Sequence, residues 1–237
     1  MTFVLVHSPL VGPLTWSPLA QELQRRGQDA VVPEVTDHPS GNAPFWQQHA
    51  RSVSRALRSV ASEPLLLVAH SGAGPLLPAI RETAGRPVDG YVFVDAGIPR
   101  AGLSRLDLLR EEAPPLAAEL EELLKDGGRW PRWSDEDLAQ EIPTPGLRRG
   151  ILQELRPRPE AFWRESIPVF EGWPDAPCGY LALSAAYAGA LARARELGWA
   201  TREMAEGHFH MLVDPRGVAD ALLDLTRELA EQGSASG

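Results

Sequence analysis

The residues best suited to chemistry lie in one short segment around Ser71. Residues 65–77 read LLLVAHSGAGPLL, so an apolar run passes directly into a turn of small residues and then into a helix. A serine at such a turn is strained and holds its hydroxyl above the end of a sheet. Ala69 and Ala73 stand where the usual motif has glycines, and alanine is the next smallest residue. We therefore predict Ser71 as a nucleophile, with the N–H of Gly72 as one donor to an oxyanion.

A histidine able to serve this nucleophile lies near the end of the chain. Residues 206–215 read EGHFHMLVDP, which places His208 in the loop between the last predicted strand and the final helix. A histidine in such a loop can reach over the sheet edge to Ser71, whereas one inside a helix could not. We prefer His208 to His210 as the general base, and assign His210 to packing or to the pocket. His70, next to the nucleophile, is interpreted as structural.

The carboxylate that would orient this histidine is predicted to be Asp95. It ends the strand that follows the nucleophile strand, in the sequence YVFVDAGIP over residues 91–99. A triad histidine needs a carboxylate to fix its tautomer and to stabilise the imidazolium formed during attack. Residues 183–187, after the following strand, read LSAAY and contain no acid. The alternative is that Asp95 merely caps a turn.

The elements that would position these residues alternate between strand and helix. This alternation is typical of a parallel sheet covered by helices on both faces. The predicted strands are Phe3–Val6, Ala30–Val32, Leu65–Ala69, Tyr91–Val94, Tyr180–Leu183 and, more weakly, Trp199–Met204. The predicted helices are 16–26, 45–61, 72–84, 188–198 and 215–231.

One segment, about 100–175, interrupts the alternation. It has helical stretches at Leu106–Glu112, Leu116–Lys125 and Asp135–Ile142, separated by prolines and glycines, and no convincing strand. We interpret it as a helical cap over one sheet edge, within a single domain spanning 1–237. Its tryptophans, Trp130, Trp133, Trp163 and Trp173, either anchor this layer to the body or wall an apolar pocket. The tail, 231–237, is predicted to be disordered.

Composition narrows the classes of partner. The chain of 237 residues has 43% hydrophobic residues and a formal net charge of −9, so nucleic acid and anionic membranes have no electrostatic reason to bind. A small hydrophobic or aromatic substrate is expected instead, with a homodimer through the acidic insert left open. The single cysteine, Cys178, and an N-terminus without a leader pattern favour a cytoplasmic protein. No metal-ligand spacing or phosphate-binding glycine loop is found, so we predict no metal and no cofactor.

On these motifs the chain resembles the α/β-hydrolase superfamily, in the compact branch of plant esterases and hydroxynitrile lyases. The resemblance runs from the Phe3 strand to the Pro215 helix and includes the first loop, VLVHSPLVGPLTW over residues 4–16. It implies an α/β-hydrolase fold and a serine hydrolase. Some dehalogenases of the family carry the acid after the earlier strand, which is a precedent for Asp95. The residues expected to contact the substrate are Pro9, Trp16, Trp163 and His210.

The first loop departs from the family pattern. The family normally has His-Gly-x, where the N–H of x is the second oxyanion donor, but here His7 is followed by Ser8 and Pro9, and proline has no N–H. Three hypotheses about the function follow. In the first, the Leu10 N–H or the Ser8 hydroxyl replaces the missing donor, and the protein hydrolyses an ester, thioester or lactone. Alternatively it is a lyase, cyclase or cofactor-independent oxygenase that does not accumulate an oxyanion, or a receptor-like ligand-binding protein.

Overall fold

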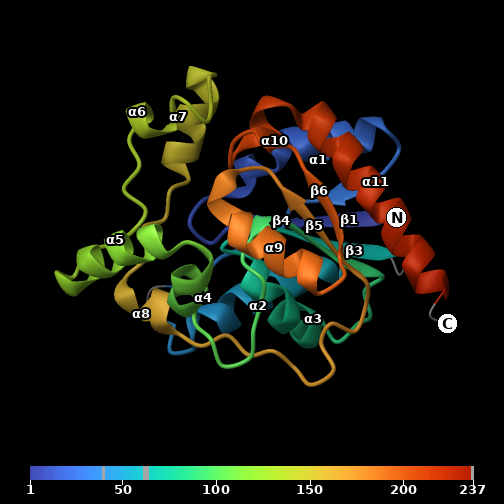
Figure 1. Ribbon diagram of the computed structural model, residues 1–237, viewed down its shortest axis with the longest axis horizontal. Coiled ribbons are helices and arrows are strands. Elements are labelled where there is room, and N and C mark those ends of the chain that lie inside the picture. Colours follow the sequence, from blue (N-terminus) through green and yellow to red (C-terminus); the bar gives the residue numbers. More distant parts are fainter. Residues whose placement is uncertain (39–40, 61–63, 236–237) are drawn as a thin grey trace.

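The computed structural model describes residues 1–38, 41–60 and 64–235, and its centre is a six-stranded sheet (Figure 1). The strand order is β2-β1-β3-β4-β5-β6 and every neighbouring pair is parallel. The strands are β1 (Thr2–Val6), β2 (Asp29–Val31), β3 (Leu65–Ser71), β4 (Gly90–Ala96), β5 (Cys178–Ala182) and β6 (Ala200–Glu203). The predicted fold class is therefore confirmed, including the weakest strand, β6.

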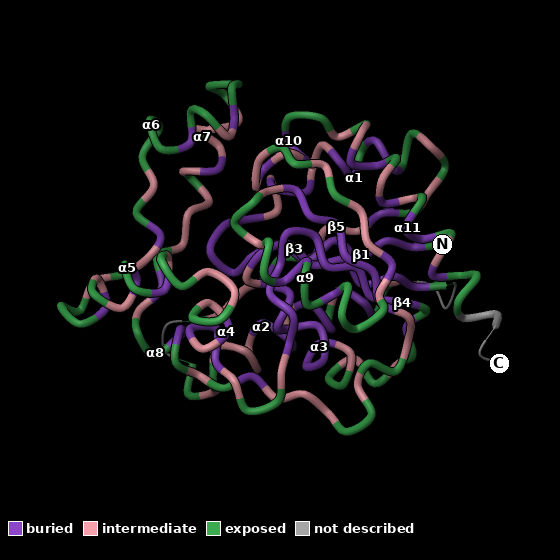
Figure 2. The backbone as a smooth tube through the Cα atoms, viewed as in Figure 1, coloured by how far each residue is buried: buried purple, intermediate pink, exposed green. Residues whose placement is uncertain are grey.

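Helices cover both faces of this sheet. Alternate residues of β1 face opposite ways, so Phe3 and Leu5 pack in one core while Val4 and Val6 pack in the other. The first core is closed by α1 (Ser17–Arg25) and α11 (Pro215–Ala235), and the second by α2 (Phe45–Leu57), α3 (Leu77–Ala84) and α9 (Ala188–Glu196). The central strands are consequently buried along their whole length (Figure 2).

The chain between β4 and β5 contains five helices among its described residues. These are α4 (Arg105–Glu112), α5 (Pro114–Lys125), α6 (Asp135–Leu138), α7 (Pro145–Gln153) and α8 (Glu160–Arg164). They extend to one side of the sheet (Figure 1), and a third apolar cluster joins α4, α5 and α8 to Leu10 in the first loop. Capping boxes at Ser104 and Ser134 begin α4 and α6. The sequence pattern missed α7 and α8, which are short and lie between prolines.

Three local expectations need correction. The predicted helix at 72–84 begins later, because a 3₁₀ turn, η2 (Gly74–Leu76), precedes α3. The loop that carries His208 leads into a short helix, α10 (His210–Val213), before α11. The tail expected to be disordered from 231 is helical to Ala235, since an established helix extends readily through Glu and Gln residues; residues 236–237 lie outside the described part.

No helix within the described ranges is long and apolar enough to cross a membrane.

Candidate active site

The serine turn has the strained backbone that its sequence predicts. Ser71 ends β3 with a φ of 58°, in the left-handed region, and the β3–β4 register shifts between His70 and Ser71. Gly74 allows this turn to pack tightly, because a Cβ there would lie 2.1 Å from the carbonyl oxygen of Gly97. Ser71 is 7% exposed and lines a cavity. Its hydroxyl is therefore held at the carboxyl end of the sheet, within reach of a bound ligand.

The structure brings His208 and Asp95 together behind this serine. Asp95 is the penultimate residue of β4, has a φ of 44° and is fully buried. Its Oδ2 accepts a hydrogen bond of 2.8 Å from His208 Nδ1 and one of 2.5 Å from Ser184 Oγ, and its Oδ1 accepts the N–H groups of Leu183 and Ser184. Burial alone would raise the pKa of Asp95, but the bonds from His208 and Ser184 bring it below its ordinary value.

This arrangement fixes the tautomer of His208. A carboxylate can only accept, so Nδ1 carries the proton and Nε2 is left with a free lone pair in the neutral ring. His208 also lines the cavity with its side chain 18% exposed. The ring can therefore take a proton from a group in the cavity while Asp95 stabilises the resulting charge.

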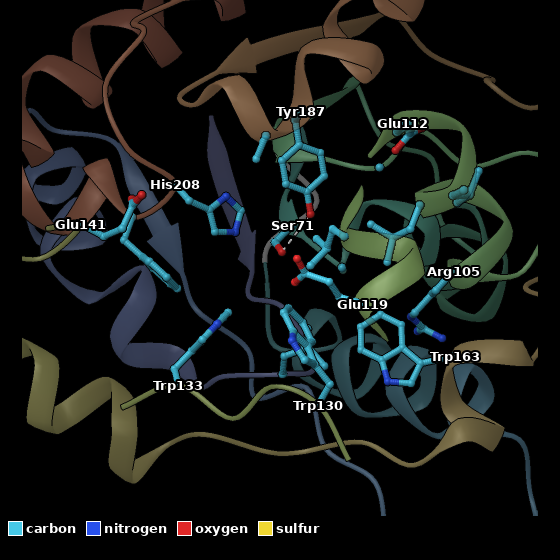
Figure 3. Close-up of a pocket in the computed structure, with 18 of the residues that line it drawn as sticks. Ser71, Arg105, Glu112, Glu119, Trp130, Trp133, Glu141, Trp163, Tyr187 and His208 are labelled. Atoms are coloured by element: carbon cyan, nitrogen blue, oxygen red, sulfur yellow. Dashed lines mark hydrogen bonds between the residues drawn. The ribbon is translucent and has the colours of Figure 1, made fainter. Parts of the chain in front are cut away.

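Tyr187 is a site residue that the sequence reasoning missed. Its hydroxyl lies 3.2 Å from Ser71 Oγ, and its ring stacks on His208 at 5.4 Å between centroids with a 12° interplanar angle (Figure 3). Burial raises the pKa of the Tyr187 phenol, so it keeps its proton. Among the hydrogen bonds of the described residues, none joins Ser71 to His208. Tyr187 ends the stretch LSAAY over residues 183–187, which the sequence analysis interpreted only for its lack of a carboxylate.

His70 has a more direct role than its sequence position indicated. Its Nε2 lies 3.0 Å from the carbonyl oxygen of His208, and the two ring centroids are 4.3 Å apart. Burial holds the pKa of His70 well below its ordinary value, so the ring is neutral and donates one hydrogen bond to that carbonyl. His70 is structural, as predicted, but the structure that it supports is the loop carrying His208.

The first loop places a hydroxyl beside the serine turn. Leu10 N–H donates to Ser8 Oγ over 3.4 Å, so the hydrogen of the Ser8 hydroxyl remains free to donate elsewhere. Ser8 is 2% exposed, and a Cβ on Gly72 would lie 3.2 Å from Ser8 Oγ and 3.9 Å from the Cδ of Pro9. The Leu10 N–H is thus already engaged with Ser8 Oγ, whereas no acceptor for the Ser8 hydroxyl hydrogen is found among the described residues.

The cavity between the sheet edge and the five-helix segment has a volume of about 510 Å³. Three of the four tryptophans of that segment, Trp130, Trp133 and Trp163, line it together with Leu10, Gly72 and Phe209 (Figure 3). Trp173 packs instead against Tyr91, Phe93 and Trp199. The interpretation of these tryptophans as simple anchors therefore applies to Trp173 alone.

Three of the four expected substrate contacts are absent from the lining of this cavity. Trp16 is fully buried in the core beneath α1 and meets His70 edge to face, so its pocket assignment is corrected. Pro9 is buried with its carbonyl turned to Arg158, and His210 begins α10 directly after Phe209, which does line the cavity. Trp163 is the expected contact that does line the cavity.

Four carboxyl groups line the cavity, those of Glu112, Glu119, Asp137 and Glu141. Glu112, the last residue of α4, lines the cavity, and its Oε2 would be 3.3 Å from a Cβ on Gly97. Burial raises its pKa to about 7, although the Ile98 N–H opposes the shift. No ion pair is recorded for it among the described residues. No sequence signal distinguished Glu112 from its exposed neighbour Glu111.

Within the described residues no group of three or more His, Cys, Asp or Glu side chains could hold a metal ion.

Comparisons with known proteins agree with this architecture. An esterase from Nocardioides sp. (strain SG-4G), described as carbendazim hydrolyzing, is 27% identical over 118 residues; the match covers 48% of this chain and 49% of the esterase, about half the length of that relative. An extracellular alpha/beta-hydrolase from a Paenibacillus species, described as homologous in structure and function to tobacco salicylic acid binding protein 2, has a TM-score of 0.76 at 19% identity and covers 95% and 98% of the two chains.

A pyrethroid hydrolase from Sphingobium faniae JZ-2 has a TM-score of 0.73 at 17% identity, and the match covers 98% of this chain and 99% of that one. At these identities the solved structures establish the fold alone. The model of the alpha/beta hydrolase family matches residues 3–221, which is most of the chain. The protein therefore belongs to the alpha/beta hydrolase family.

Proposed function

We propose that the protein is a serine-dependent hydrolase of small, largely apolar carboxylic esters, thioesters or lactones, with Ser71 as nucleophile, His208 as general base and Asp95 as the orienting acid. The observation that carries the proposal is the Asp95–His208 hydrogen bond of 2.8 Å behind a serine of positive φ. Hydrolysis is also supported by the protein's membership of the alpha/beta hydrolase family and by its similarity to proteins described as an esterase and as a pyrethroid hydrolase.

The proposed reaction begins when Ser71 turns from Tyr187 toward His208. His208 Nε2 takes the hydroxyl proton as Ser71 Oγ bonds to the carbonyl carbon, and the carbonyl oxygen becomes an oxyanion. The carbon–oxygen bond to the leaving group then breaks, and His208 returns the proton to the departing alcohol. A water molecule then gives a proton to His208 Nε2 as its oxygen bonds to the acyl carbon. The bond from that carbon to Ser71 Oγ breaks, His208 returns the proton to Ser71 Oγ, and the carboxylic acid leaves. Asp95 stays ionised throughout and stabilises the imidazolium formed in each half.

The oxyanion would be held by the Gly72 N–H and the Ser8 hydroxyl. Ser8 takes the place of the donor that Pro9 lacks, because its Oγ lies beside Gly72 and its hydrogen is free. The oxygen of the tetrahedral intermediate then receives two hydrogen-bond donors. This second donor favours hydrolysis over the lyase and oxygenase alternatives, for which no feature of the site argues.

The cavity supports a small aromatic or aliphatic substrate. Its walls are mainly apolar, with three tryptophan rings facing the space above Ser71 (Figure 3). Glu112 in the same wall would oppose an anionic substrate above pH 7, when its carboxyl is ionised. We therefore expect neutral esters to be preferred to esters that carry a second carboxylate.

The test combines labelling with a substrate panel. A fluorophosphonate probe should add to Ser71 in the intact protein and not in the Ser71→Ala variant, with the site located by peptide mass spectrometry. p-Nitrophenyl esters of increasing acyl length should be hydrolysed by the native protein and not by Ser71→Ala or His208→Ala. An unmodified intact mass after prolonged incubation, or activity confined to deprotonation of acidic aromatic compounds, would overturn the proposal.

A further inference from the structure

A buried arginine from the segment between α7 and α8 contacts the first loop directly. Arg158 is 6% exposed, and its Nε and Nη2 both donate to the carbonyl oxygen of Pro9, at 3.0 and 2.8 Å. Two donors from one planar guanidinium on one acceptor fix the direction of that carbonyl. Arg158 lies far along the chain from Pro9 but adjoins the loop that faces the serine turn.

The charge of Arg158 is balanced on its other side. Its Nη1 forms an ion pair of 2.7 Å with Asp37 Oδ1, which also lies 3.0 Å from His49 Nε2. Burial lowers the pKa of His49 to about 4, so this histidine is neutral and donates to Asp37. Burial would raise the pKa of Asp37, but His49 and Arg158 lower it to about 2. The cation on the Pro9 carbonyl therefore persists across the neutral pH range.

The Pro9–Leu10 peptide transmits this contact to Ser8. In a trans peptide the C=O and N–H bonds point in opposite directions. With the Pro9 carbonyl held by Arg158, the Leu10 N–H points the other way and donates to Ser8 Oγ over 3.4 Å. That bond occupies a lone pair of Ser8, which directs the hydroxyl hydrogen away from Leu10 and leaves it available on the Gly72 side.

We propose that Arg158 is a positioning residue for the oxyanion site, acting through the Pro9–Leu10 peptide on the hydroxyl of Ser8. In this chain of contacts, the Arg158 guanidinium donates to the Pro9 carbonyl, and the N–H of the same peptide donates to Ser8 Oγ. The Ser8 hydroxyl then donates to the oxyanion. Each hydrogen bond polarises the next, so the positive charge strengthens the final donor. The inference rests on the proposed function, since it concerns the charge formed at Ser71.

A second contact shows that the whole 156–158 segment holds this loop. Arg156 N–H donates to the carbonyl oxygen of Leu10 at 2.8 Å, and the Arg156 side chain donates to Val35 O at 3.0 Å. The segment is itself paired with Trp130 by two backbone hydrogen bonds to Arg158. Because the hydrogen bond given for the Arg156 side chain goes to Val35 and not to residues 8–10, Arg156→Gln is a matched control for substitutions at Arg158.

The experiment is a mutant cycle between Arg158 and Ser8. Arg158→Lys keeps the positive charge but loses the pair of hydrogen bonds to the Pro9 carbonyl oxygen. Arg158→Gln combined with Asp37→Asn removes both charges of the ion pair, so neither charge is left buried and unpaired. Each is made with and without Ser8→Ala. With p-nitrophenyl acetate we expect kcat to fall by about tenfold at either Arg158 change, less than for a deleted donor, while KM stays within about twofold. In the Ser8→Ala background the same changes should have no further effect.

The binding of a transition-state analogue distinguishes a role in oxyanion stabilisation from a merely structural role, because a merely structural role would leave that binding unchanged. 2,2,2-Trifluoroacetophenone would form a hemiketal oxyanion on Ser71, and its inhibition constant should rise in parallel with the loss of kcat. Arg156→Gln should change neither value. Equal losses with and without Ser8→Ala, or an unchanged inhibition constant, would overturn the role of Arg158. Failure of the native protein to react with fluorophosphonate would instead overturn the proposed function.

Discussion

The hydroxyl of Ser8 can be tested by removing it and then restoring a donor from the backbone. Ser8→Ala deletes one of two proposed oxyanion donors, which costs about 2.7–4 kcal/mol of transition-state stabilisation in hydrolases of this type. That corresponds to a loss of about 10²–10³ in kcat. Ser8 is 2% exposed, so water has little access to take over its role. Because Ser8 Oγ lies against Gly72 and not in the apolar wall, KM should change little.

The rescue follows from the direction of the Pro9 ring. The Cδ of Pro9 is bonded to its nitrogen and lies 3.9 Å from the position of a Cβ on Gly72. Replacing Pro9 by alanine exchanges that Cδ for an N–H pointing in the same direction, toward the site of the oxyanion. Ser8→Gly combined with Pro9→Ala, which recreates the common His-Gly-x pattern, should therefore recover at least about tenfold over Ser8→Ala.

The assay is steady-state hydrolysis of p-nitrophenyl acetate, with fluorophosphonate labelling as a check that Ser71 remains reactive. Pro9→Ala alone serves as the control, since it adds a donor without removing Ser8 and should not lower kcat. A Ser8→Ala protein within about twofold of native kcat would refute the assignment of Ser8. Failure of the Pro9 change to restore activity would show that the loop does not face the oxyanion.

Three further outcomes are expected. Asp95→Asn should lower kcat by roughly 10³–10⁴-fold, because the amide lets His208 adopt the wrong tautomer; a near-native rate would place the acid elsewhere. Tyr187→Phe should raise the rate of fluorophosphonate labelling by up to about fivefold, since it frees Ser71 from a competing hydrogen bond worth about 1 kcal/mol; slower labelling would mean that Tyr187 assists the attack. Glu112 has its pKa raised from 4.5 to about 7, so the stability that its neutral form provides is complete below pH 4.5 and is lost as pH rises through 7. Relative to Glu112→Gln, the native unfolding free energy should fall by up to roughly 3 kcal/mol between pH 5 and 8.5, measured by urea denaturation; a pH-independent difference would contradict the burial of this carboxyl.

The parts of the fold that were predictable are those where one local rule decides the structure. The apolar strands β1, β3 and β4 are buried on both faces, so their sequences have no competing interpretation. The Ser71 turn is constrained by sterics between its small neighbours, and its left-handed φ follows from them. His208 and Asp95 could be paired because both follow strands at the same sheet edge.

The parts that were not predictable depend on contacts between distant segments. Tyr187 becomes a site residue only because the chain after β5 folds back over His208. The exclusion of Trp16 from the pocket follows from the packing of α1 on the sheet, which places that ring in the core. Arg158 resembles any other arginine of an acidic, proline-rich insert until the position of Pro9 is known. None of these relations leaves a periodicity or a motif in the sequence.

The segment between β4 and β5 contributes to the site in two separable ways. Trp130, Trp133 and Trp163 lie in the cavity wall together with Glu112, and this wall should govern which substrate binds. The backbone N–H of Arg156 and the side chain of Arg158 hold the first loop. These contacts should govern how strongly the oxyanion is stabilised. Changes on the cavity wall should therefore act mainly on KM and on substrate preference, whereas changes at Arg158 should act on kcat for every ester alike. Exchanging this segment for one of different sequence would alter both properties together unless the contact with Pro9 were retained.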